Sequence, residues 1–117
     1  YTYISEEKIE AMMPVDERTI QPFGILHGGA ALALAETIAG VGSLFICDSD
    51  QIAVGTQVSA NHFSSARRGD VSVKGVGTII HKRRSTHIWN IDIVTLSGRL
   101  ISSVRIVNSI LTKKYDR

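Results

Sequence analysis

The sequence contains one long apolar stretch, residues 25–47, that a chain of 117 residues has to bury. Its part from Gly29 to Cys47 is rich in Ala, Leu and Ile, and Glu36 is the one charged side chain among residues 28–46. Ala and Leu are strong helix formers, and a helix that is apolar on all sides is a buried one. We therefore predict a single helix of about 28 Å in the core.

Glu36 stands in the middle of this predicted helix, where an unpaired carboxylate is costly to bury. Positions three, four and seven residues away share its face. Apart from the bulky Leu32, they carry small residues: Gly29, Ala33, Ala39, Gly40 and Ser43. Small residues let a backbone or a ligand approach closely. Glu36 is accordingly either a buried carboxylate held by hydrogen bonds or a catalytic carboxylate that lines a slot.

The run His27-Gly28-Gly29 stands at the start of the predicted helix. The N–H groups of a helix N terminus are unpaired and carry a partial positive charge, so they bind anions and polarised oxygens. Glycine lets a substrate approach that backbone closely, and a carbonyl placed there would have its developing negative charge stabilised. A glycine pair is a weak signal alone, but it gains specificity from the apolar helix and the single Glu nine residues after the His.

The remainder of the chain predicts strands joined by turns. Their ranges are 1–15 before the helix and 52–63, 71–80, 88–94 and 100–111 after it. Trp89, Ile91 and Ile93 alternate onto one face, and Gly75 and Gly77 suggest a bend. Short turns join antiparallel neighbours. We therefore predict one α+β domain, residues 1–117, in which an antiparallel sheet of about five strands wraps around the helix.

A single sheet does not cover the whole circumference of an apolar helix. We therefore also expect a dimer, in which two helices and two sheets pack side by side.

Charge and cysteine content argue against several classes of protein. The net charge of +2 gives no strong electrostatic case for binding nucleic acid. The single cysteine, Cys47, suits a reducing cytoplasm and is expected to be buried at the end of the helix. The histidines lack metal-ligand spacing, so no metal site is expected. The apolar stretch is long enough to raise the question of a membrane span, but the central Glu36 and the interrupting glycines argue against one, and no cleavable leader is expected.

Three runs of the sequence resemble the hotdog-fold acyl-CoA thioesterases, in particular the branch that hydrolyses aromatic acyl-CoA esters. They are MPVDERTIQPFGILHGGAALALAETIAG, VGTQVSANHFSSARRG and HKRRSTHIWNIDI, and with the closing strand they cover nearly the whole chain. Within the branch, the sequence is similar to thioesterases that act on 1,4-dihydroxy-2-naphthoyl-CoA and to those that proofread siderophore synthesis. The resemblance implies the hotdog fold, the same arrangement of one sheet around one helix that the pattern of elements predicts.

The resemblance also implies four catalytic residues: Gln21, His27, Gly28 and Glu36. Glu36 would be the general base or the nucleophile, and the sequence does not choose between these roles. The N–H of Gly28 would hold the thioester carbonyl oxygen, while Gln21 and His27 would orient the carbonyl or the water. In this branch the Gln and the His come from one subunit and the Glu from the other, in dimers that pair into tetramers.

One position departs from the family pattern. Relatives often carry Ser one helical turn after the Glu, whereas this chain has Gly40. Thr37 or Ser43 would then place the water, and the change bears on which substrate is preferred.

CoA carries phosphates, so its site is expected to contain basic and small polar residues. Two turn segments fit, residues 62–68 and 81–87, although their residues taken alone favour solvated turns. With two glycines, they supply the substrate contacts that the resemblance implies: Gly40, Gly55, His62, Ser64, Ser65, His81, Arg83, Arg84 and Ser85. CoA is part of the substrate, so no separate cofactor is expected. Phe23, Ile25 and the small helix faces suggest a flat apolar slot that suits an aryl group.

Two other functions stay open on the sequence alone. A hydroxyacyl-thioester dehydratase of the same fold also uses a His and a helix carboxylate, but it usually has a bulky residue or Pro after its His, where this chain has Gly28 and Gly29. A non-catalytic acyl-CoA-binding module would have little use for the charge of Glu36. Acyl-CoA hydrolysis is the function that the sequence favours.

Overall fold

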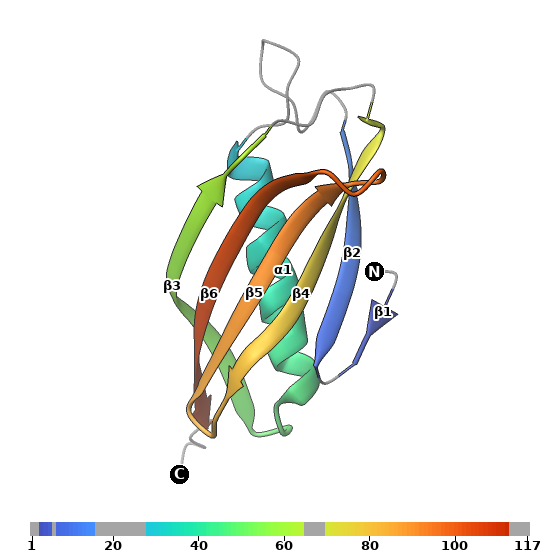
Figure 1. Ribbon diagram of the computed structural model, residues 1–117. Helices are drawn as coiled ribbons and strands as arrows, with labels where there is room; N and C mark the ends of the chain where they lie inside the picture. The colour runs from blue at the N-terminus through green and yellow to red at the C-terminus, as the bar shows by residue number, and fades with distance from the viewer. Residues whose placement is uncertain (1–2, 6, 16–27, 65–69, 113–117) are drawn as a thin grey trace.

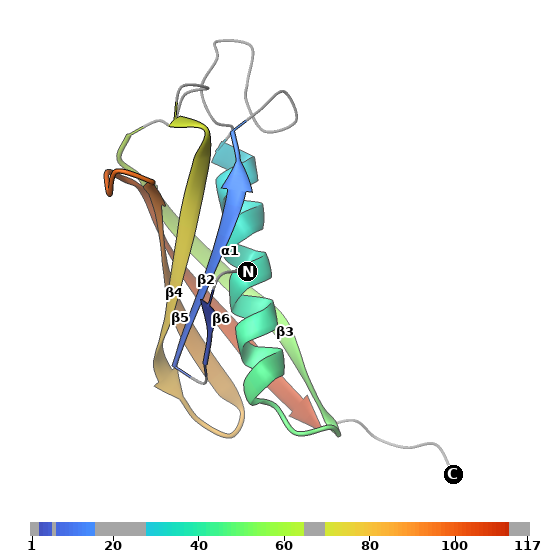
Figure 2. The same cartoon turned by 90° about the vertical axis from the view of Figure 1, so that its right-hand side faces the viewer.

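A computed structural model describes residues 3–5, 7–15, 28–64 and 70–112. Its elements follow in the order β1 (Tyr3–Ile4), β2 (Lys8–Pro14), α1 (Gly28–Ile46), β3 (Gln51–His62), β4 (Ser72–Lys82), β5 (Thr86–Thr95) and β6 (Leu100–Thr112). The described strands form one antiparallel sheet in the order β1-β2-β4-β5-β6-β3, and α1 lies along one face of it (Figure 1, Figure 2). The prediction of one long helix and an antiparallel sheet of about five strands is confirmed, with the two-residue β1 in addition.

β3 lies at one edge of the sheet, beside β6, and is not a neighbour of β4. The prediction that short turns make all the later strands neighbours is therefore wrong for β3 and β4. Three residues separate β4 from β5 and four separate β5 from β6, which are hairpin lengths. Nine residues, 63–71, separate β3 from β4. That is enough chain to cross the end of the sheet, where three strand spacings amount to about 14 Å.

The core lies between α1 and the sheet. From the helix, small side chains and one large one are fully buried, and from β5 every second side chain is buried, as predicted for Trp89, Ile91 and Ile93. The helix residues are Ala31, Ala35, Ile38 and Ala39. The alanines let the helix backbone come close to the strands. Of the small residues predicted to share the face of Glu36, Ala39 and Ser43 belong to this buried face, whereas Ala33 is exposed.

Gly75 and Gly77 form a recess in β4 that receives Ile38. A Cβ on Gly75 would collide with Ile38 Cδ1, and a Cβ on Gly77 would lie 2.7 Å from Ile38 Cγ2. β4 keeps its register with β5 through both glycines, and the shift lies three residues on, between Ile79 and His81. The glycines therefore make room for the helix, and the bend that the sequence suggests at them stays a prediction.

The opposite side of α1 is open in the single chain. Leu44 and Phe45 near its end are 61% and 51% exposed, and Cys47 just beyond it is half-buried, not buried as expected. By length and mean hydropathy, residues 29–46 would also qualify as a membrane span. Here α1 packs along the sheet, with contacts to β2, β3, β4, β5 and β6, in the manner of a core helix.

Candidate active site

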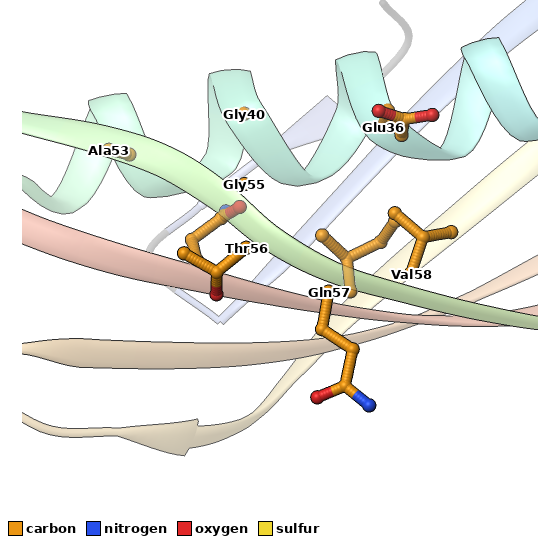
Figure 3. A pocket seen from close by; sticks show the side chains of 9 residues that line it. Glu36, Gly40, Ala53, Gly55, Thr56, Gln57 and Val58 are labelled. Carbon is orange, nitrogen blue, oxygen red and sulfur yellow. The ribbon is translucent and has the colours of Figure 1, made fainter.

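Glu36 lies at an open pocket between α1 and β3 (Figure 3). The pocket has a volume of about 300 Å³. It is lined by Glu36 and Gly40 of α1, by Ala53, Gly55, Thr56, Gln57 and Val58 of β3, and by Ile106 and Asn108 of β6. Glu36 and Gly40 stand on successive turns of the helix, with Gly55 on the strand that runs alongside. Three residues that the sequence assigned to the site, Glu36, Gly40 and Gly55, are thus brought together.

The side chain of Glu36 is exposed, and within the described ranges its carboxylate has no hydrogen-bond or ion-pair partner. Of the two arrangements that the sequence left open, the structure has the one in which the carboxylate lines a slot. A carboxylate that is open to solvent and free of partners can accept a proton from water or attack a carbonyl carbon. The geometry therefore allows both chemical roles.

The small residues around Glu36 face two different ways. Ala39 and Ser43 are fully buried against the sheet, whereas a Cβ on Gly40 would meet no atom within 4 Å. Gly40 therefore leaves open space beside the carboxylate. The expectation that Ser43 places the water is wrong, because its side chain has no access to the pocket. Thr37 is exposed, and its hydroxyl donates to the helix backbone one turn earlier at 2.8 Å.

The N terminus of α1 is at Gly28, one residue before the predicted start. The first turn holds no acidic side chain, so no acidic group within it neutralises the positive end of the helix dipole. Eight residues, or about 12 Å of helix, separate Gly28 from Glu36. The other residues predicted near this end lie outside the described ranges: Gln21, Phe23, Ile25 and His27. Ser65, predicted as a CoA contact, also lies outside them.

A buried polar group lies beneath the pocket, and the sequence did not predict it. It consists of Ser43, His87, Trp89 and Asn108, all buried. Ser43 Oγ lies 2.8 Å from His87 Nδ1, 2.9 Å from Trp89 Nε1 and 3.0 Å from Asn108 Nδ2. Burial, and then the charge of Lys82, lowers the pKa of His87. In the described ranges, neither this group nor any other gathers three His, Cys, Asp or Glu that could hold a metal ion.

The described residues of the two segments predicted to bind CoA lie at opposite ends of the sheet. His62 ends β3, where its Nδ1 lies 2.6 Å from Ser102 Oγ, and Ser64 Oγ donates to the carbonyl of Leu100 at 2.7 Å. The other predicted contacts are exposed beside the start of β3: His81 near the end of β4, and Arg83, Arg84 and Ser85 in the β4–β5 turn. The twelve residues of β3, about 40 Å, separate the two segments. One chain therefore does not bring them together.

Known thioesterases are similar to this chain over most of its length. The family model described as "Thioesterase superfamily" matches residues 23–102. The 1,4-dihydroxy-2-naphthoyl-CoA hydrolase of Escherichia coli (strain K12) is 42% identical, over 95% of this chain and 80% of that protein. The proofreading thioesterase EntH of Cronobacter sakazakii is 40% identical over the same shares.

Solved thioesterase structures share the fold. A crystal structure of a Haemophilus influenzae thioesterase has a TM-score of 0.91 at 37% identity and covers 99% of this chain and 80% of that one. Two structures of one Staphylococcus aureus thioesterase, with TM-scores of 0.90 and 0.88 at 37% and 36% identity, cover 95% and 93% of this chain and 91% and 89% of theirs. They carry a Glu-to-Ala and a Gln-to-Ala substitution at positions 15 residues apart, the separation of Gln21 and Glu36 here.

These similarities extend through both sequence and fold, and they favour hydrolysis over the dehydratase and the binding module. The chain belongs to the thioesterase superfamily, as a hotdog-fold enzyme that hydrolyses acyl-CoA thioesters.

Proposed function

We propose that the protein hydrolyses aromatic acyl-CoA thioesters, such as 1,4-dihydroxy-2-naphthoyl-CoA or hydroxybenzoyl-CoA, with Glu36 as its catalytic carboxylate. The observation that carries this proposal is the position of Glu36. It is the one charged residue of α1, and it lies exposed at the pocket without a partner in the described ranges. Gly40 and Gly55 leave room beside it for a flat acyl group.

In the proposed reaction, water adds its oxygen to the thioester carbonyl carbon, the C–S bond breaks, and the CoA thiolate leaves and takes up a proton. As general base, Glu36 takes a proton from the attacking water; as nucleophile, it forms an anhydride with the acyl group, which water then hydrolyses. The Gly28 N–H holds the carbonyl oxygen, and a donor of this kind lowers the barrier by about 2.7–4 kcal/mol. Gln21 and His27 orient the carbonyl or the water, and no separate cofactor takes part.

Glu36 and Gly28 of one chain are too far apart to act on one carbonyl group. About 12 Å of helix separates them, whereas catalytic groups have to lie within about 3 Å of the atoms that they serve. The proposal therefore joins Glu36 of one copy to Gln21, His27 and Gly28 of a second copy, the division that the family resemblance implies.

The open edge of β3 supports the proposal of a homodimer. Among the described strands it pairs with β6 alone, so its other edge is open over twelve residues. Ile52, Val54 and Val58 of this strand are exposed, and a long open edge with apolar side chains is a surface that another strand readily covers. Antiparallel pairing of β3 with its copy would also bring the two CoA segments, one from each chain, to the same end of the joined sheet. A tetramer of two such dimers in the cytoplasm completes the proposal.

Release of free CoA thiol from benzoyl-CoA or hydroxynaphthoyl-CoA tests the proposed function. We expect turnover by the wild type and a loss of about a hundredfold or more in Glu36→Ala. Glu7→Ala, which removes another exposed glutamate outside the pocket, is the matched control and should keep its activity. Equal activity of Glu36→Ala and wild type would contradict the catalytic assignment. Much faster turnover of medium-chain alkyl-CoA would contradict the aromatic substrate.

A further inference from the structure

Asn108 belongs to two parts of the molecule at once. It lies on β6 opposite Gly55 of β3 and is only 3% exposed, yet it lines the pocket that contains Glu36. Its Nδ2 donates to the carbonyl oxygen of Ala39 at 3.2 Å and to Ser43 Oγ at 3.0 Å. These two hydrogen bonds connect β6, which forms part of the pocket wall, to the middle of α1.

The partners in this buried group allow a single arrangement of hydrogen atoms. A backbone carbonyl only accepts, so the atom of Asn108 that faces Ala39 is the amide nitrogen. An indole N–H only donates, so Ser43 Oγ accepts from both Trp89 and Asn108. With both lone pairs used, the Ser43 hydroxyl donates its own proton to His87 Nδ1, which is therefore unprotonated. The lowered pKa of His87 agrees with this arrangement.

Because both N–H donors of Asn108 are used, its Oδ1 is turned toward the pocket. A Cβ on Gly55 would lie 3.7 Å from Oδ1, so the absence of a side chain at Gly55 leaves this oxygen uncovered. No residue in the described ranges donates to Oδ1, and none of their fully buried side-chain oxygens or nitrogens lacks a partner. A group in the pocket can therefore donate a hydrogen bond to Oδ1, whose orientation is fixed by the two bonds of the amide nitrogen.

This acceptor stands apart from the catalytic carboxylate. Ala39, which Asn108 contacts, lies three residues, about 4.5 Å, farther along α1 than Glu36, while a helical side chain leans toward the helix N terminus. If the thioester carbon lies beside Glu36, Asn108 therefore lies next to a different part of the substrate. The phosphates of CoA have to reach solvent, whereas Asn108 lies buried beside Ile106. The far end of an acyl group carries no phosphate and can stay buried, so it fits the position of Oδ1.

We propose that Asn108 is a specificity-determining residue: its Oδ1 accepts a hydrogen bond from a hydroxyl or N–H group at the far end of the acyl group. Ser43, His87 and Trp89 are positioning residues that hold its amide in this orientation. The inference rests on the proposed hydrolysis of aromatic acyl-CoA. An acyl group without such a donor displaces water from Oδ1 and leaves a buried acceptor unsatisfied, so the site discriminates against it.

The test compares kcat/KM for benzoyl-CoA with kcat/KM for the three ring isomers of hydroxybenzoyl-CoA. We expect the wild type to prefer at least one hydroxylated isomer by about tenfold or more, and Asn108→Leu to lower this ratio to about two or less. Gly55→Ala covers Oδ1 without removing a bond of the buried group, so it should lower the same ratio. Asn90→Leu, which makes the same exchange at a partly exposed asparagine of β5 outside the pocket, is the matched control and should keep the ratio.

A wild-type ratio near one overturns the inference. So does an Asn108→Leu variant that slows all four substrates equally, since a purely structural role predicts that result. If Asn108→Leu does not fold, Gly55→Ala decides, because an unchanged ratio in that variant overturns the inference. Turnover of alkyl-CoA without turnover of any benzoyl-CoA contradicts the proposed function and the inference with it, whereas fast turnover of all four substrates without a preference overturns the inference alone.

Discussion

Two sides of α1 both carry small residues, but one side packs into the core and the other leaves a pocket open. On the sheet side, Ala35 and Ala39 let the helix approach, and Ile38 fills the recess over the glycines of β4. On the side that faces the edge strand β3, Gly40 of the helix and Gly55 of the strand leave a pocket open, and Glu36 lies at this pocket. Small residues in a helix therefore indicate close approach, and the side chain that lies opposite decides whether a core or a pocket results.

The largest effect on stability should come from a substitution on the packed side of α1. Ile38→Ala removes a fully buried side chain and should lower the free energy of unfolding by about 2–5 kcal/mol. Glu36→Ala, on the open side, should change it by no more than about 0.5 kcal/mol. Urea denaturation of both variants beside the wild type measures the difference. Similar losses in the two variants would mean that the two sides of α1 do not differ in packing.

The sequence predicted those features that depend on local spacing. The helix ends lie within one residue of the predicted ones. The alternation in β5 correctly predicted that Trp89, Ile91 and Ile93 share one face, which is the buried face. Local spacing shows which face a residue takes but not what lies opposite it. For that reason β3 was placed beside β4, and the packing of Ile38 over Gly75 and Gly77 was not predicted.

The candidate site was predicted in part for the same reason. Glu36, Gly40 and Gly55 do meet at one pocket, whereas Asn108 was missed. Its contact with Ser43 spans 65 residues of sequence, and the contact of Ser43 with His87 spans 44, so no motif connects them. One signal was available: the alternation that turns Trp89 inward also turns His87 inward, two residues earlier.

A smaller effect should appear in the pH dependence of stability, through the buried group under the pocket. Burial lowers the pKa of His87 in the folded chain below its ordinary value of 6.5, so the unfolded chain takes up this proton first as the pH falls. Its contribution to stability is therefore complete above about pH 6.5 and is lost as the pH falls toward the folded-state pKa. The loss is at most about 1.4 kcal/mol per pH unit.

Denaturation midpoints between about pH 7.5 and pH 5.5 measure this contribution. His87→Gln should flatten the decline in stability, while His81→Gln, at an exposed position, should leave it unchanged. A wild-type decline that persists unchanged in His87→Gln would show that another group is responsible.

In the proposed shared site, Glu36 of one copy acts on a carbonyl group whose oxygen is held by Gly28 of a second copy, and His27 of that second copy orients the carbonyl or the water. Glu36→Ala and His27→Ala should each be strongly impaired alone, but a mixed dimer contains one site with both residues intact. If the two variants are unfolded and refolded together in equal amounts, half of the dimers are mixed and half of their sites are complete. A site shared between two copies predicts recovery to about a quarter of wild-type activity. No recovery, in a sample shown to contain mixed dimers, would contradict the shared site.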